Sequence, residues 1–256
     1  MRTPVRAKKN LGQHFLRSSD TAKNIADCLP LVCGNCLEIG PGMGILTKHL
    51  LEKDINLKVI EIDGESIDFL LANAVIASTQ CIQGDFLKLP MTEFFGGEPF
   101  TVTGNFPYNI SSQIMFKVIE NRELVPAVAG MFQREVARRI CSPAGSKEYG
   151  ILSVLIQAFY NTQYHFTVDE HEFNPPPKVK SGVISMVRKE NYTLPCDEKL
   201  FFEVVKTSFN QRRKTLNNSL KKLLKDKKLE ESIGLKRPEQ LSVDDFIQLT
   251  NFIAEE

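Results

Sequence analysis

The segment Gly104-Asn105-Phe106-Pro107-Tyr108-Asn109 combines hydrogen-bond acceptors, a restrained turn and an aromatic ring. An adenine amino nitrogen is a poor nucleophile because its lone pair is delocalised into the ring. The side-chain oxygen of Asn105 and the main-chain carbonyl of Phe106 can accept both amino hydrogens, which favours a tetrahedral nitrogen as a methyl group arrives. Pro107 fixes the turn, and a base stacked on Tyr108 gains roughly 1–3 kcal/mol. The motif predicts amine methylation by positioning; a turn with Tyr108 packed in the core is the alternative.

A glycine-rich loop, Glu38-Ile39-Gly40-Pro41-Gly42-Met43-Gly44, is the candidate cofactor site. Its glycines Gly40, Gly42 and Gly44 permit a tight turn and close approach of a ligand to backbone amides. A dinucleotide fingerprint would place the third glycine one residue later, where Ile45 stands, so this spacing is typical of S-adenosylmethionine-dependent methyltransferases. A nicotinamide cofactor is the alternative.

Two carboxylates follow the next two predicted strands. Glu61, 19 residues after Gly42, is predicted to accept hydrogen bonds from both ribose hydroxyls of the cofactor. Asp85 is predicted to accept from the amino group of the cofactor adenine. Each carboxylate alone is as readily a helix cap, but with the glycine loop they form a coherent nucleoside site.

These residues require a scaffold of alternating strands and helices. Strands are predicted at 35–40, 57–63, 80–85, 100–105 and 127–133, and helices at 45–51, 67–74, 135–141 and 151–160, after a first helix capped by Asp20 that ends near Leu29. Such repeated units predict an α/β, Rossmann-like class I methyltransferase sheet, mostly parallel, with ligands at the carboxyl ends of its strands.

A terminal antiparallel hairpin is expected from residues 164–168 and 182–187, which alternate in polarity. The proline run Pro175-Pro176-Pro177 links these two strands as a rigid loop. Phe173, just before it, is a candidate for the wall of the base pocket opposite Tyr108. A core or hinge role for Phe173 is the alternative.

The chain changes character after residue 189, so we expect a methyltransferase domain at 1–189 and a small C-terminal helical RNA-binding domain at 190–256. Residues 191–197 resemble a linker, and 238–252 read as a final helical segment. Between them runs an apolar stripe at helical spacing, formed by Phe201, Val204, Val205, Phe209, Leu216, Leu220, Leu223 and Leu224.

Charge is segregated along the chain although the net charge is only +1. Residues 1–17 carry +5 and residues 206–228 carry +8, which leaves −12 on the remainder. Two basic islands on an acidic body favour a polyanion bound at particular places, whereas two solvated helix faces are the alternative. The candidate RNA contacts are Arg212, Arg213, Lys214, Lys221 and Lys222.

Other classes of protein are disfavoured by composition. No run approaches the roughly 18 apolar residues of a membrane helix, and the basic first 17 residues lack the apolar core of a signal peptide. A cytoplasmic protein is expected. Cys33 and Cys36 have the spacing of a zinc or redox pair, but no second pair follows, so no metal site is expected.

In these motifs the chain resembles the KsgA/RsmA family of ribosomal RNA adenine dimethyltransferases. Matching stretches span nearly the whole chain: residues 9–16, 38–44, 59–63, 84–85, 104–108, 173–177, 209–216 and 237–242. The resemblance implies that His14 and Leu16 close over the cofactor beside Gly40, Glu61, Asp85 and Asn105. Lys180 stands where the family commonly has an acidic residue.

The resemblance also implies the substrate. It is two adjacent adenosines in a 3′-terminal hairpin of 16S rRNA, dimethylated with S-adenosylmethionine late in assembly of the 30S subunit. A monomer without an obligate protein partner is expected. The rivals are a large-subunit rRNA adenine methyltransferase of the antibiotic-resistance type and a mainly non-enzymatic assembly factor. A nicotinamide oxidoreductase is a third class, which predicts binding of NADH.

Overall fold

The computed structural model describes residues 5–255. The strands are β1 (Phe15–Leu16), β2 (Asn35–Ile39), β3 (Asn56–Glu61), β4 (Cys81–Gln83), β5 (Thr101–Asn105), β6 (Ala127–Gln133), β7 (Tyr160–Val168), β8 (Phe173–Asn174) and β9 (Ser181–Arg188). The helices are α1 (Ser19–Asp27), α2 (Ile45–Leu50), α3 (Gly64–Ala72), α4 (Thr92–Phe95), α5 (Ser111–Glu120), α6 (Arg134–Cys141), α7 (Ile151–Phe159), α8 (Glu198–Asn210), α9 (Leu216–Ser219), α10 (Lys221–Leu224), α11 (Glu231–Gly234) and α12 (Val243–Ala254). The chain folds into two compact units, residues 5–137 with 161–188, and residues 138–160 with 189–255.

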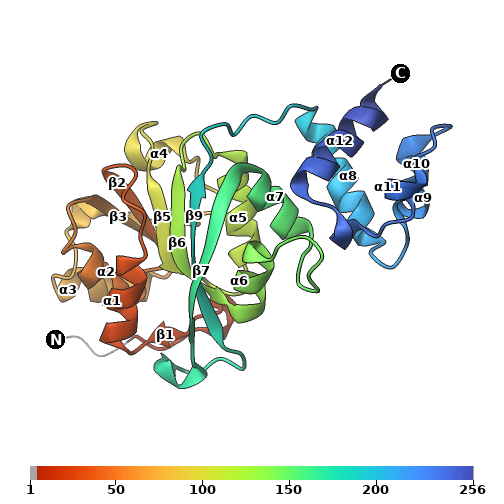
Figure 1. Cartoon of the computed structure of the whole chain (residues 1–256). Helices are drawn as coiled ribbons and strands as arrows, with labels where there is room; N and C mark the ends of the chain where they lie inside the picture. The colour runs from red at the N-terminus through yellow and green to blue at the C-terminus, as the bar shows by residue number, and fades with distance from the viewer. Residues whose placement is uncertain (1–4, 256) are drawn as a thin grey trace. The chain divides into compact units, whose positions relative to one another are not determined.

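A seven-stranded sheet forms the first unit, with strand order β4-β3-β2-β5-β6-β9-β7 (Figure 1). The pairs β3–β4, β2–β3, β2–β5 and β5–β6 are parallel, whereas β9 runs antiparallel to β6. The chain continues from β2 to β3 on one side and from β5 to β6 on the other, so a topological switch point lies between the adjacent carboxyl ends of β2 and β5. The expected mostly parallel α/β sheet is confirmed.

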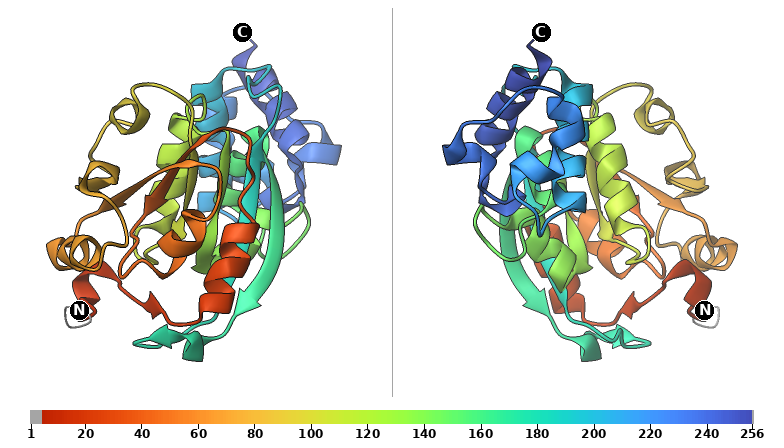
Figure 2. Two further views of the ribbon diagram at one scale, coloured as in Figure 1. Left: turned by 90° about the vertical axis from the view of Figure 1, so that its left-hand side faces the viewer. Right: turned by 90° about the vertical axis from the view of Figure 1, so that its right-hand side faces the viewer.

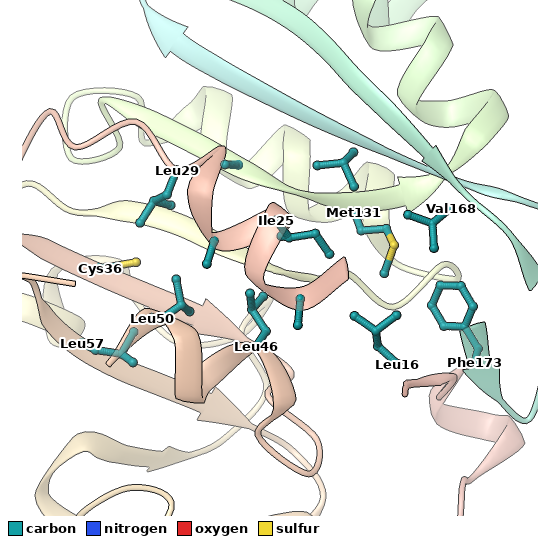
Figure 3. Close-up of a cluster of buried hydrophobic side chains, with 14 residues drawn as sticks. Leu16, Ile25, Leu29, Cys36, Leu46, Leu50, Leu57, Met131, Val168 and Phe173 are labelled. Atoms are coloured by element: carbon teal, nitrogen blue, oxygen red, sulfur yellow. The ribbon is translucent and has the colours of Figure 1, made fainter. Parts of the chain in front are cut away.

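Helices cover both faces of this sheet, α1 on the face seen in the left view of Figure 2 and α5 on the face seen in the right view. On the α1 side, Ile25 packs with Leu46 and Leu50 of α2 against Cys36, Leu57 and Met131 of the strands (Figure 3). All of these side chains are nearly inaccessible to solvent. Because this cluster packs β2 against α2, it fixes the two ends of the glycine loop that connects them.

Residues 9–17 form an arm along the carboxyl edge of the sheet. A short 3-10 turn at Lys9–Leu11 leads into β1, which pairs antiparallel with β8, Leu16 opposite Phe173. The amide of Arg17 donates to the carbonyl of Glu172 at 2.8 Å. Two segments more than 150 residues apart in sequence are thus joined beside the ends of β2 and β5.

The second unit is helical and contains the predicted apolar stripe. Phe201, Val204 and Val205 of α8 are buried, and so are Leu216, Leu220 and Leu224 farther along the chain. Phe209 lies 5.9 Å from Phe246 of α12, between ring centroids. Ser242 caps α12 with its hydroxyl, which accepts from the amide of Asp245.

The structure corrects two local expectations. The N-cap of α1 is Ser18, whose hydroxyl accepts from the amide of Thr21 at 3.1 Å, so the assignment to Asp20 is wrong. Asp20 instead lies in the first helical turn, where its charge is favourable. Helix α5 was not predicted, although Ile114, Met115, Val118 and Ile119 repeat at helical spacing. Within residues 5–255, no helix has the length and apolar character needed to span a bilayer.

Candidate active site

The glycine loop and the Asn105–Tyr108 corner line one cavity at the carboxyl edge of the sheet. β2 and β5 are neighbours in the sheet, so the segments that follow them emerge side by side. The lining also includes the arm residues 11–16 and Glu38. The spatial requirement of the sequence interpretation, that both motifs face a common cavity, is therefore met.

Gly42 and Gly44 have different structural reasons to be glycine. Gly42 has φ +55°, and a Cβ there would lie 2.9 Å from the ring of Phe15. Gly44 has φ +79°, and its Cβ would lie 2.7 Å from Leu70 and Val75. Gly40 and Gly42 line the cavity, whereas Gly44 is outside its lining and packs α2 closely against its neighbours.

Backbone amides hold the Glu61 carboxylate in place. Oε2 accepts from the amide of Gly42 at 3.2 Å, and Oε1 accepts from the amides of Ile62 and Asp63 at 2.9 and 3.0 Å. Burial raises the pKa of Glu61 although these three donors oppose the shift. A carboxylate offers about four acceptor positions, so a site on Oε2 remains to accept from a ligand hydroxyl.

Glu38 is a second buried carboxyl group that lines the cavity. The sequence placed it in the glycine loop but gave no reason to assign it a function of its own. Its Oε2 accepts from Thr47 Oγ1 at 2.7 Å. Burial raises its pKa to about 8, with a smaller contribution from the negative charge of Glu61. Glu38 is therefore mostly protonated near neutral pH.

Asp85 lies in an adjoining cavity, which shares five lining residues with the first: Leu11, Gly40, Glu61, Ile62 and Pro107. Its Oδ1 accepts from the amide of Leu87 at 3.0 Å. Glu61 thus stands between the glycine loop on one side and Asp85 on the other, as the order of the strands predicts.

The amide of Asn105 is oriented by the arm. Its Nδ2 donates to the main-chain carbonyl of His14 at 3.0 Å, which leaves Oδ1 as the acceptor of this side chain. The amide of Phe106 donates to the carbonyl of Met131 at 3.0 Å, and its ring is buried against Phe132. The acceptors at 105 and 106 are therefore attached to fixed backbone.

His14 joins three parts of this unit. Its Nδ1 lies 2.8 Å from the carbonyl of Pro175, and because a carbonyl only accepts, Nδ1 carries the hydrogen. In the neutral ring, Nε2 is then an acceptor. The His14 ring also stacks on Tyr108, with centroids 5.6 Å apart, so arm and catalytic corner are in direct contact.

The ring of Tyr108 is held at its hydroxyl end. Its hydroxyl and that of Ser181 in β9 are 2.5 Å apart, and burial raises the pKa of Tyr108.

Phe173 lies in the core and not at the cavity. It is 2% exposed, packs with Leu16 and Met131 (Figure 3) and is absent from the lining of the cavity. Leu16 bridges the two regions, because it lies in this core and also lines the cavity.

The charges around the two cavities indicate what kind of ligand they fit. Among residues 5–255, the lining contains Glu38, Glu61 and Asp85 but neither lysine nor arginine. A pyrophosphate would find no cationic side chain here, whereas a cationic nucleoside would meet carboxyl groups. The residues therefore fit S-adenosylmethionine, with its sulfonium and ammonium groups, better than the anionic pyrophosphate of a dinucleotide.

The predicted RNA contacts all belong to the helical second unit, where they differ in exposure. Arg213, Lys214, Lys221 and Lys222 are exposed. Arg212 is instead tied down, because its guanidinium donates to the carbonyl of Lys147 at 2.8 Å and lies 3.6 Å from Glu239. Arg212 thus has a structural function within this unit.

Cys33 and Cys36 are free thiols. Within the described part of the chain, no cluster of three or more His, Cys, Asp or Glu side chains could hold a metal ion. Burial raises the pKa of the Cys36 thiol far above its usual range.

This sheet order, with a glycine turn after β2 and a ligand cavity at the strand ends, defines a class I methyltransferase. A family model described as ribosomal RNA adenine dimethylase matches residues 5–255. The chain belongs to this family. It is 59% identical over 251 residues to ribosomal RNA small subunit methyltransferase A of Flavobacterium johnsoniae, which covers 97% of this chain and 96% of that protein.

Solved structures share the fold. A dimethyladenosine transferase from Plasmodium falciparum is similar with a TM-score of 0.76 and 25% identity, over 92% of this chain and 96% of that one. The 23S rRNA methyltransferase ErmE is similar with a TM-score of 0.67 and 23% identity, over 93% and 99%. The second likeness concerns the fold alone.

Proposed function

We propose that this chain dimethylates the N6 amines of two adjacent adenosines in a 3′-terminal hairpin of 16S rRNA, with S-adenosylmethionine as the methyl donor. The observation that carries the proposal is the cavity that the glycine loop shares with the Asn105–Tyr108 corner. The near-full-length identity to a small-subunit methyltransferase supports the choice of RNA. The identity of 59% to that enzyme, against 23% to the 23S rRNA methyltransferase ErmE, favours the small-subunit substrate over that of the antibiotic-resistance enzymes.

The chain's own residues bind the cofactor and hold the base. S-adenosylmethionine supplies an electrophilic methyl group when bound. Glu61 accepts from one of the two ribose hydroxyls through the open position on Oε2, and Asp85 accepts from the adenine amine. The backbone around Gly40 and Gly42 admits the ligand closely, while His14 and Leu16 cover it from the arm. Among the described residues, no lysine or arginine lines the two cavities to repel this positively charged ligand.

Catalysis consists mainly of positioning. Oδ1 of Asn105 and the carbonyl of Phe106 accept the two N6 hydrogens of the target adenosine. Both acceptors are fixed before the substrate binds, Oδ1 of Asn105 through the bond of its amide nitrogen to His14, and the carbonyl of Phe106 through the β5–β6 pairing. Pro107 restrains the turn, and Tyr108 stacks on the flipped base. Phe173 acts from the core beneath, where it supports Leu16 and the β1–β8 pair.

The remaining assignments concern the whole chain. We assign methyl transfer to residues 1–189 and RNA contact to the helical part, 190–256, through Arg213, Lys214, Lys221 and Lys222, with Arg212 holding that surface in shape. The protein acts as a cytoplasmic monomer on the assembling 30S subunit, without an obligate protein partner.

One experiment tests the reaction and the substrate together. Purified protein is incubated with labelled S-adenosylmethionine and either unmethylated 30S or 50S subunits, and the RNA is digested for nucleoside analysis. We expect N6,N6-dimethyladenosine from the 30S sample alone, at two adjacent positions in primer extension. Label in 50S rRNA would identify the large-subunit rival, and binding without label would identify an assembly factor.

A further inference from the structure

The loop after β4 makes a single helical turn that stops abruptly. The amides of Lys88 and Leu89 both donate to the carbonyl of Asp85, at 2.9 and 3.2 Å. Pro90 follows and has no amide hydrogen, so the turn cannot continue as a helix. The carbonyls of Phe86 and Leu89 are left to find partners outside the turn.

One lysine supplies those partners. Nζ of Lys117 in α5 donates to the carbonyl of Phe86 at 2.6 Å and to that of Leu89 at 2.5 Å. The same ammonium lies 5.1 Å from the centroid of the Phe86 ring, in a cation–π contact. Lys117 therefore binds the turn near its first residue and at its last.

These hydrogen bonds connect the segment that contains Asp85 with the helix that follows Tyr108. The turn begins with Asp85, and α5 begins three residues after Tyr108. Burial lowers the pKa of Lys117, while the nearby Asp85 and Glu120 carboxylates oppose that shift. The ammonium is thus within the electrostatic reach of the carboxylate whose loop it holds.

We propose that Lys117 is a positioning residue that aims Asp85 at the amino group of the cofactor adenine and so sets the preference for that base. This inference rests on the proposed function. Oδ1 of Asp85 accepts from Leu87 N, and Oδ2 lies 3.6 Å from Nζ of the exposed Lys88, so recognition depends on where the turn directs this carboxylate. Without Lys117 the two carbonyls would turn to water, because buried acceptors left unpaired are costly, and Asp85 would move with them.

The chain contains a matched control for this lysine. Nζ of Lys58 in β3 donates to the carbonyl of Phe94 at 2.8 Å and lies 5.0 Å from the Phe95 ring centroid. Neither Lys58 nor Phe94 lines the cavities. Lys58→Met removes the same kind of contact as Lys117→Met, but away from the ligand.

The test compares two nucleosides that differ at the position Asp85 reads. Affinities of 5′-methylthioadenosine and 5′-methylthioinosine are measured by calorimetry for the full-length protein and its variants. We expect the wild type to prefer the adenosine compound. Lys117→Met should reduce that preference on the order of tenfold, the worth of one hydrogen bond to a charged group. Lys58→Met and the donor-retaining Lys117→Arg should keep it.

An unchanged preference in Lys117→Met would overturn the proposal, and so would an equal reduction in Lys58→Met. If Lys117→Met does not fold, Lys117→Gln and Lys117→Arg decide, because the arginine variant should keep the preference and the glutamine variant should reduce it. Failure of the proposed function itself looks different: wild-type protein would then bind neither nucleoside, nor S-adenosylmethionine.

Discussion

The side-chain amide of Asn105 is held through its nitrogen, Nδ2, whereas its oxygen, Oδ1, is the atom offered to a substrate. His14 contributes its main-chain carbonyl, and any residue at position 14 would provide the same acceptor. The side chain of His14 has a separate task, because its Nδ1–H lies at the Pro175 carbonyl and its ring stacks on Tyr108. A substitution at position 14 that leaves the backbone in place therefore keeps the first contact and changes the second.

Replacement of Asn105 should separate chemistry from binding. Asn105→Ala removes the acceptor Oδ1, and we expect methyl transfer at saturating cofactor to fall on the order of 100-fold, as for the loss of one preorganised catalytic hydrogen bond. RNA affinity should remain unchanged, as measured by filter binding. Asn56→Ala, at the opposite end of the sheet, is the control and should keep full activity. Equal losses of activity and RNA affinity in Asn105→Ala would contradict the catalytic role.

Glu38 should make stability depend on pH. Its folded pKa of about 8 lies above the usual value of 4.5, so the native state holds a proton that the unfolded chain releases. Its stabilising contribution is therefore complete below pH 4.5 and is lost as the pH rises toward 8, by up to about 1.4 kcal/mol per pH unit. Denaturant unfolding from pH 5 to 9 should show this slope in the wild type, and Glu38→Gln should flatten it. Parallel curves for both proteins would refute a protonated Glu38.

At the scale of elements, local patterns predicted the sheet and its edge. Apolar runs ending in polar residues located β2, β3 and β5 to within about two residues, and parallel strands bring their carboxyl ends together. Glu61, Asp85 and Asn105 converge for that reason. Phe173 could not be placed by the same reasoning, because its burial depends on pairing with Leu16, far away in sequence.

The attachment of the arm was also beyond the reach of local patterns. Lys8 and Asp63 are 55 residues apart, and nothing in either segment indicates that they meet. In the structure, Nζ of Lys8 contacts Asp63 Oδ1 at 2.6 Å and Glu65 at 3.0 Å. Gln13 bridges its own arm to Asp63, since it accepts from the amide of Lys8 and donates to Oδ2 of Asp63. The amide of Asp63 in turn donates to Glu61.

Loosening this attachment should weaken cofactor binding and slow the reaction together. The double variant Lys8→Met, Gln13→Ala frees the arm that contains His14, so the KM for S-adenosylmethionine should rise by about fivefold, the upper worth of a partly exposed ion pair. Because the His14 carbonyl also orients Asn105, kcat should fall even when cofactor is saturating. Lys23→Met, which breaks the exposed Lys23–Asp27 pair of α1, is the control. A rise in KM with an unchanged kcat would mean that the arm only covers the cofactor.

At the scale of the whole molecule, charge is divided between the two units. The cavities of the first unit are lined by carboxyl groups, whereas the second has exposed cations around α9 and α10. A cationic ligand and a polyanion thus each meet the opposite charge in a different unit. The sequence predicted the basic island at residues 206–228, but not that Arg212 would be engaged with Lys147 and Glu239. The described part of the other predicted island, residues 5–17, belongs to the first unit, where Lys8 is paired with Asp63 and Glu65.

Neutralising the exposed cations should therefore weaken RNA binding without harming the fold. Each phosphate contact contributes about 0.7–0.9 to the slope of log affinity against log salt. The variant Arg213→Gln, Lys214→Gln, Lys221→Gln, Lys222→Gln should lower that slope by about three for unmethylated 30S subunits, while affinity for S-adenosylmethionine stays constant. The charge-matched control replaces Lys23, Lys48, Lys53 and Lys58 by glutamine in the first unit, and should change the slope much less. Arg212 is left intact because its loss would disturb packing and charge at once. Equal slopes for the quadruple variant and the wild type would remove this surface from the RNA interface, and equal effects of variant and control would mean that net charge, not a defined contact, attracts the RNA.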